Sequence, residues 1–166
     1  MNILDTIKAQ KLKEVEALKL NFSISDLEKF PLFNSTTNSL KNAVKNALSG
    51  GVIAEFKRKS PAKGNINLEA NVAEVTQGYV DAGVVGLSVL TDELFFGAKK
   101  DDFQLARKNK IIPILRKDFI VDEYQIFQSK AMGADVILLI AKFLTNKELQ
   151  SFSNLAHELG LEVFLE

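Results

Sequence analysis

Four ionisable side chains lie at the carboxyl ends of apolar segments and could transfer protons or stabilise charge. They are Glu55, Lys57, Lys117 and Glu166. A neighbouring carboxylate raises the pKa of a lysine, whereas desolvation lowers it, so such a cluster can act as a general acid or as an electrostatic clamp. The same charges could equally form a structural ion-pair network. The residues alone leave both interpretations open.

The alternation of side chains along a strand predicts that these charges share one face. Glu55 and Lys57 have the parity of Ile53, Lys117 has the parity of Leu115, and Glu166 that of Phe164. In a barrel of parallel strands the face toward the helices is apolar, which would place the charges inside, at the carboxyl-terminal mouth. A solvated Glu55–Lys57 pair at a strand edge is the alternative.

A basic loop follows the first of these strands. Residues 57–64 place four cations around Ser60, Pro61 and a glycine, so the loop could close over a phosphate or carboxylate, or simply be solvated. Farther along, Phe95 and Phe96 precede a glycine and offer aromatic surface to a substrate or to the core.

Composition excludes several other functions. Lys plus Arg and Asp plus Glu both number 21, so no net charge attracts nucleic acid or an anionic membrane. No cysteine and one histidine argue against disulfides, thiol chemistry and a zinc site, and His157 is expected at the surface. The first 19 residues contain neither a signal peptide nor a membrane span, which favours a cytoplasmic protein.

The elements that must position these residues alternate regularly after Gly51. Short apolar runs separated by amphipathic stretches, with no hairpin signal, predict right-handed parallel βαβ units. The predicted strands are Val52–Phe56, Val84–Leu90, Ile111–Leu115, Val136–Ile140 and Leu161–Leu165. The predicted helices are Glu69–Ala82, Lys99–Lys110, Asp122–Met132 and Asn146–Leu159. Spacing alone does not decide between an open sheet and a closed barrel.

The first 50 residues have a different pattern. Apolar residues at three- and four-residue spacing predict one amphipathic helix at the start, and a second helix, Leu40–Leu48, is expected to end at Gly50 and Gly51. At the other end, the sequence stops within the apolar run that closes at Glu166. Because a complete eight-fold barrel needs about 250 residues, we expect a chain truncated after its fifth strand.

The most distinctive string of the sequence is IAEFKRKSPAKG, at residues 53–64. Further motifs follow at residues 87–92, 115–120, 133–140 and 161–166. In these motifs and in their order the sequence resembles indole-3-glycerol phosphate synthases, a family of (β/α)8 TIM-barrel lyases. The resemblance implies an α/β fold with an N-terminal helical extension, residues 1–50, followed by five strands and four helices of the barrel, residues 51–166.

The resemblance also implies an activity that needs no cofactor and no metal. The family closes the ring of a phosphorylated anthranilate sugar, 1-(2-carboxyphenylamino)-1-deoxyribulose 5-phosphate, to indole-3-glycerol phosphate, with loss of CO2 and water, in tryptophan biosynthesis. Lys117 would be the general acid that activates the carbonyl, and Glu166 would move a proton in the dehydration. Glu55 and Lys57 would position the substrate and share the proton transfers.

Other implied contacts are less specific. Ser60 and Pro61 would border the substrate, and Phe96, Phe119 and Leu138 would line the pocket for its ring. The family usually has a serine after the glycine of its second-strand loop, whereas this chain has Ala98. The family's phosphate-binding loops lie in the C-terminal third, so we expect these 166 residues alone to be inactive.

Two other functions remain as alternatives. One is another phosphosugar-binding barrel enzyme, such as phosphoribosylanthranilate isomerase, although lysines on both the first and third strands argue against it. The other is a non-enzymatic half-barrel that pairs with a partner through its open edge. Fusion or association with another tryptophan-pathway enzyme is a further expectation about partners.

Overall fold

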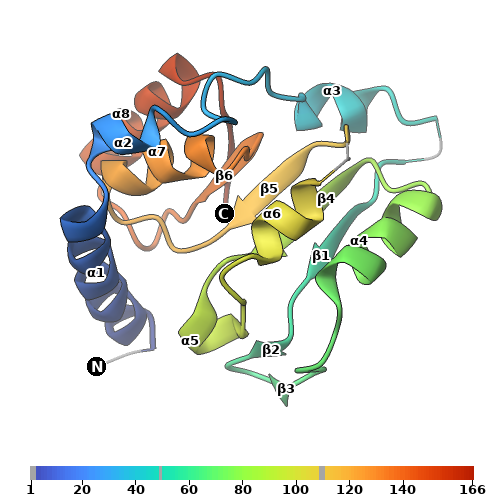
Figure 1. Cartoon of the computed structure of the whole chain (residues 1–166), viewed down its shortest axis with the longest axis horizontal. Helices are drawn as coiled ribbons and strands as arrows, with labels where there is room; N and C mark the ends of the chain where they lie inside the picture. The colour runs from blue at the N-terminus through green and yellow to red at the C-terminus, as the bar shows by residue number, and fades with distance from the viewer. Residues whose placement is uncertain (1–2, 49, 109–110) are drawn as a thin grey trace. The chain divides into compact units, whose positions relative to one another are not determined.

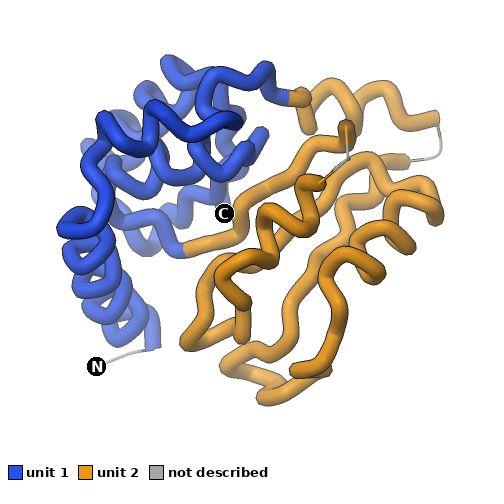
Figure 2. The backbone as a smooth tube through the Cα atoms, viewed as in Figure 1, with its two compact units in different colours: residues 1–37, 119–166 blue, residues 38–118 orange. Residues whose placement is uncertain are grey.

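The computed structural model describes residues 3–48, 50–108 and 111–166 and is shown in Figure 1. The chain divides into two compact units, which Figure 2 distinguishes by colour. Unit 1 contains residues 1–37 and 119–166, and unit 2 contains residues 38–118. Each unit has its own helices and parallel strands.

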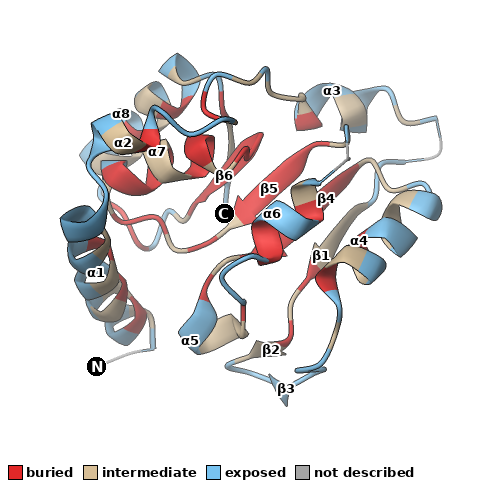
Figure 3. Ribbon diagram, in the orientation of Figure 1, coloured by how far each residue is buried: buried red, intermediate tan, exposed pale blue. Residues whose placement is uncertain are grey.

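Unit 2 is built on three parallel strands. β4 (Gly86–Leu90) pairs with β1 (Ile53–Phe56) on one side and with β5 (Ile114–Lys117) on the other. All five β4 residues are buried, as expected for a strand with a neighbour on each side and both faces covered (Figure 3). The helices are α3 (Leu40–Lys45), α4 (Val72–Asp81), α5 (Glu93–Phe96) and α6 (Asp102–Arg107).

The two faces of this sheet differ in chemistry. α4 packs on β1 and α6 packs on β4, against Phe56, Val89 and Ile114, which are each less than 5% exposed. On the opposite face, Leu40 of α3 covers the start of β4, where a Cβ on Gly86 would lie 2.5 Å from the Leu40 Cδ1 atom. Glycine at this position therefore allows α3 to pack directly on the strand.

Unit 1 combines the N-terminal helices with the C-terminal third of the chain. β6 (Val136–Leu139) pairs in parallel with β7 (Glu162–Leu165). The helices are α1 (Ile3–Asn21), α2 (Ile24–Leu27), α7 (Glu123–Ala131) and α8 (Asn146–Glu158). Both α2 and α8 begin with a capping box, in which a Ser or Thr hydroxyl and an acidic side chain three residues later satisfy free backbone amides.

Polar contacts fasten α1 to α7 and to the loop after β6. Lys19 forms an ion pair with Asp122 at 2.8 Å, and the Tyr124 hydroxyl donates to the Phe22 carbonyl at 3.0 Å. The Lys8 ammonium donates to the Phe143 carbonyl at 2.6 Å. The N-terminal helix is thus held to the carboxyl-terminal side of β6 within unit 1.

The five predicted strands are confirmed, with one displacement. The third strand begins at Ile114, three residues later than predicted, because Ile111 is 86% exposed and Pro113 has no amide hydrogen to donate to a ladder. The predicted absence of hairpins is wrong. β2 (Lys59–Ser60) and β3 (Gly64–Asn65) form a short antiparallel pair in the loop after β1.

The predicted helices are also confirmed, although their ends differ. The helix predicted over residues 40–48 ends at Lys45, and the one predicted over 99–110 covers Asp102–Arg107; residues 49, 109 and 110 lie outside the described part of the chain. The short helices α2 and α5 were not predicted. The division into residues 1–50 and 51–166 stays a prediction.

Among the described helices, none is long and apolar enough to cross a membrane.

The buried phenol of Tyr124 generates a testable prediction. Desolvation, and then the Asp26 charge, raise the pKa of Tyr124 above 10.0, while Lys19 lowers it. Tyr124→Phe loses the hydrogen bond to Phe22 and should lower the free energy of unfolding by about 1 kcal/mol near neutral pH. Because the pKa of Tyr124 is higher in the folded protein, its hydroxyl contributes fully to the free energy of unfolding below pH 10.0. That contribution is lost as the pH rises through the folded pKa.

Urea unfolding of wild type and Tyr124→Phe at a series of pH values measures both parts of this prediction. The difference between the two proteins should narrow above about pH 10. A difference that stays constant into strong alkali would contradict the raised pKa.

Candidate active site

The carboxylate of Glu55 lies at the centre of a small polar cluster on unit 2. Lys57 forms an ion pair with Glu55 Oε1 at 2.6 Å, and the Ser88 hydroxyl donates to Oε2 at 3.2 Å. The Glu55 and Lys57 side chains are 31% and 34% exposed, so both are partly desolvated and still accessible. The neighbouring residues Phe56 and Arg58 point instead toward the helices, because Arg58 reaches Asp102 of α6. The cluster therefore occupies the sheet face opposite α4 and α6.

Lys117 ends β5 on the same face. The register pairs Glu55 with Ser88 and Leu90 with Lys117. Lys117 therefore lies two residues farther toward the carboxyl end of the sheet than Glu55, at the level of Lys57. β4 lies between the two lysine-bearing strands, which are separated by roughly 10 Å, or two strand spacings. Glu55 and Lys117 therefore lie on the two strands that flank β4, on one face of the sheet.

Side chains flanking Lys117 fix the end of its strand. Arg116 donates to Asp118 at 3.0 Å and to the Thr91 hydroxyl at 3.0 Å, and Thr91 in turn donates to Asp118 at 2.6 Å. The Thr91 amide also donates to the Lys117 carbonyl at 3.1 Å. Because Arg116 and Asp118 are each about 5% exposed or less, these bonds hold the backbone on both sides of Lys117.

The basic loop after β1 is not the four-cation anion site that its sequence suggested. Arg58 is 3% exposed and forms a bidentate ion pair with the equally buried Asp102, and it also donates to the carbonyl of Ala70. Its guanidinium lies 4.9 Å from the Phe56 ring centre. The prediction is therefore wrong for Arg58, whose charge is neutralised in the core.

The remaining loop residues lie around this buried pair. Ser60 is half-buried in β2 and accepts a hydrogen bond from the Lys63 amide at 3.1 Å, while Pro61 is exposed in the turn. Phe96 is half-buried at the end of α5, which Gly97 terminates with φ of 72°. The position corresponding to the family's loop serine, Ala98, is 8% exposed, so its methyl group belongs to the core.

Three predicted site residues belong to unit 1. Leu138 of β6 is 2% exposed and pairs with Phe164, and the Phe119 ring stacks on Phe143 with 5.2 Å between centroids. Glu166 directly follows β7, and its amide and carbonyl continue the ladder with Leu139 at 2.9 Å and Ala141 at 2.8 Å. Glu166 thus shares the parity of Phe164, as predicted.

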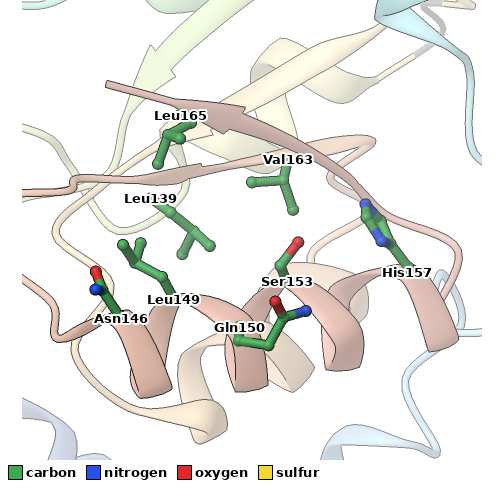
Figure 4. A pocket seen from close by; sticks show the side chains of 8 residues that line it. All are labelled: Leu139, Asn146, Leu149, Gln150, Ser153, His157, Val163 and Leu165. Atoms are coloured by element: carbon green, nitrogen blue, oxygen red, sulfur yellow. The ribbon is translucent and has the colours of Figure 1, made fainter.

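A groove of about 520 Å³ on unit 1 lies away from these residues. Figure 4 shows Leu139, Val163 and Leu165 facing α8, with Ser153 and the exposed His157 along its rim. These strand positions have the opposite parity to Leu138 and Phe164. The groove therefore lies on the helix-facing side of β6 and β7 and contains none of the predicted catalytic residues.

The structure adds one residue to the site that the sequence did not single out. Ser88 is the single polar residue of the strand sequence GLSVL, where nothing in the sequence marks it as functional. Only the pairing of β4 with β1 places its hydroxyl against Glu55. In the described parts of the chain, no group of three or more His, Cys, Asp or Glu side chains is arranged to hold a metal ion.

Parallel strands that alternate with helices, with charged side chains at the carboxyl ends of β1 and β5, define an α/β protein with a candidate enzyme site. Comparison with known proteins gives the family. A model described as indole-3-glycerol phosphate synthase matches residues 4–166. The chain belongs to the indole-3-glycerol phosphate synthase family, which confirms the resemblance drawn from the sequence.

Individual relatives agree with this assignment. The indole-3-glycerol phosphate synthase of Bacteroides thetaiotaomicron is 47% identical over 165 residues, which cover 99% of this chain and 63% of the relative. The Neisseria gonorrhoeae enzyme is 41% identical and the Legionella pneumophila enzyme is 42% identical, with coverage of 65% and 63% of their lengths. The chain therefore spans slightly less than two thirds of these curated relatives.

The buried Arg58–Asp102 pair gives a prediction about stability. Asp102→Ala would leave the guanidinium in the core without its counter-charge and would remove the acceptor for the Lys99 amide at 2.7 Å. We expect a loss of about 3–5 kcal/mol in the free energy of unfolding, measured by urea titration. The exposed neighbour Asp101 is the matched control, because Asp101→Ala should change stability by less than about 0.5 kcal/mol. Equal effects of the two substitutions would contradict the assignment.

Proposed function

We propose that the full-length protein is an indole-3-glycerol phosphate synthase that converts 1-(2-carboxyphenylamino)-1-deoxyribulose 5-phosphate into indole-3-glycerol phosphate, CO2 and water. The family membership of residues 4–166 supports this proposal. The observation that carries it is the Glu55–Lys57 ion pair at the carboxyl end of β1, at the level where Lys117 ends β5. The domain division at residue 50 and the place in tryptophan biosynthesis belong to the same proposal.

The chemistry assigns a step to each charged residue. Lys117 gives a proton to the substrate carbonyl oxygen while the carboxylate-bearing ring carbon bonds to the carbonyl carbon. Breaking the bond to the carboxylate then releases CO2 and restores the aromatic ring. In the dehydration, the new hydroxyl takes up a proton and leaves as water while the adjacent methylene carbon loses a proton to form the ring double bond. Glu166 donates or accepts one of these two protons. Glu55 and Lys57 hold the substrate and share the proton transfers.

The aromatic and loop residues are assigned to binding. Ser60 and Pro61 border the substrate, and Phe96, Phe119 and Leu138 contact its ring. The half-buried side chains of Phe96 and Phe119 support this assignment, because part of each remains accessible to a ligand. Leu138 is almost fully buried, so it contributes shape rather than a large contact area.

The central test compares indole formation by the full-length protein and by Lys117→Ala. Loss of the general acid should lower kcat by about 10²–10⁴-fold. Lys100→Ala is the matched control, because Lys100 is exposed and should leave activity unchanged. Fluorescence of the indole product reports turnover, and residues 1–166 add no tryptophan to the background. A folded wild-type protein that isomerises phosphoribosyl anthranilate and forms no indole would contradict the proposal.

A second prediction concerns residues 1–166 expressed alone. The remaining third of the relatives has no counterpart in the matched region, and phosphate sites of barrels come mainly from the seventh and eighth units. We expect this fragment to show no turnover in the same fluorescence assay under conditions where the full-length protein is active. Measurable indole formation by the fragment would disprove this expectation.

A further inference from the structure

Ser88 is a buried hydroxyl that lies directly beside a proposed catalytic carboxylate. It occupies the middle of β4, is 5% exposed, and is the register partner of Glu55 on β1. Its Oγ atom donates to Glu55 Oε2 at 3.2 Å. Lys57 holds the other carboxylate oxygen at 2.6 Å.

Burial gives this hydroxyl a cost that its hydrogen bond must offset. A hydroxyl removed from water is unfavourable unless it is hydrogen-bonded, whereas an alanine methyl group in the same strand would carry no such penalty. Every other residue of β4 is glycine or aliphatic, so the strand has one polar side chain, and that side chain faces Glu55. The contact is therefore a specific feature of this face of the sheet.

We propose that Ser88 is a positioning residue that fixes the carboxylate of Glu55 for the reaction; this inference rests on the proposed function. Lys57 alone is a weak restraint, because its ammonium ends a flexible four-carbon chain. A second donor from the neighbouring strand fixes the orientation of the carboxylate plane. A carboxylate has about four acceptor positions, so these two bonds leave others for the substrate.

Ser88→Ala in the full-length protein tests the proposal. We expect kcat/KM for indole formation to fall by about tenfold, the value for one hydrogen bond to a charged group. Ser129→Ala is the matched control: Ser129 is fully buried on α7, and its hydroxyl donates to the Gln125 carbonyl at 2.6 Å, remote from Glu55 in the chain. It removes a buried hydroxyl in the same way and should leave kcat/KM within about twofold of wild type. Thermal melts establish that both variants are folded at the assay temperature.

A double-mutant cycle separates positioning from a general structural effect. If Ser88 acts through Glu55, Ser88→Ala causes no further loss on a Glu55→Ala background. A tenfold loss that persists on this background overturns the proposal, and so does a folded Ser88→Ala protein with wild-type kcat/KM. Absence of indole from folded wild type overturns the proposed function and the positioning role together, whereas indole formation insensitive to Ser88→Ala overturns the positioning role alone.

Discussion

The parallel pairing of β4 with β1 and β5 is the constraint on which the chemistry of unit 2 depends. In a parallel sheet all strands present their carboxyl ends at one edge, and register partners point to the same face. Glu55, Ser88 and Lys117 come from three separate segments, and only this pairing gives them a common face. A shift of one residue in either register would turn the affected side chain toward α4 and α6.

The ion pairs of unit 2 named above differ in burial. Arg58 with Asp102, and Arg116 with Asp118, are almost fully buried pairs whose partners neutralise them within the core. Glu55 and Lys57 are about one third exposed and remain accessible to a ligand. Both buried arginines directly neighbour a proposed catalytic lysine in the chain, Arg58 after Lys57 and Arg116 before Lys117. Because side chains alternate between the two faces of a strand, each buried arginine stabilises the core while the lysine next to it lies on the face of the candidate site.

In unit 1, the N-terminal helix is part of the same compact body as the later strands. Lys8 holds the carbonyl of Phe143, and the Phe143 ring stacks on Phe119, a residue proposed to contact the substrate. Tyr124 and Asp122 of the α7 region fasten the other end of α1. Unit 1 thus joins the first helices to residues 119–166, and the boundary between helical extension and barrel at residue 50 stays a prediction.

The sequence by itself determined the strand and helix order, the parity of Glu55, Lys57 and Lys117, and the family, because periodicity and the string 53–64 are local properties of the chain. It did not reveal the β2–β3 pair, whose two-residue strands are too short to show a period. It could not distinguish the buried Arg58 from the half-buried lysines on either side of it, since its partner Asp102 lies 44 residues away. The role of Ser88 could not be predicted for the same reason. Strand pairing is a long-range interaction, and it decides which side chain lies opposite Glu55.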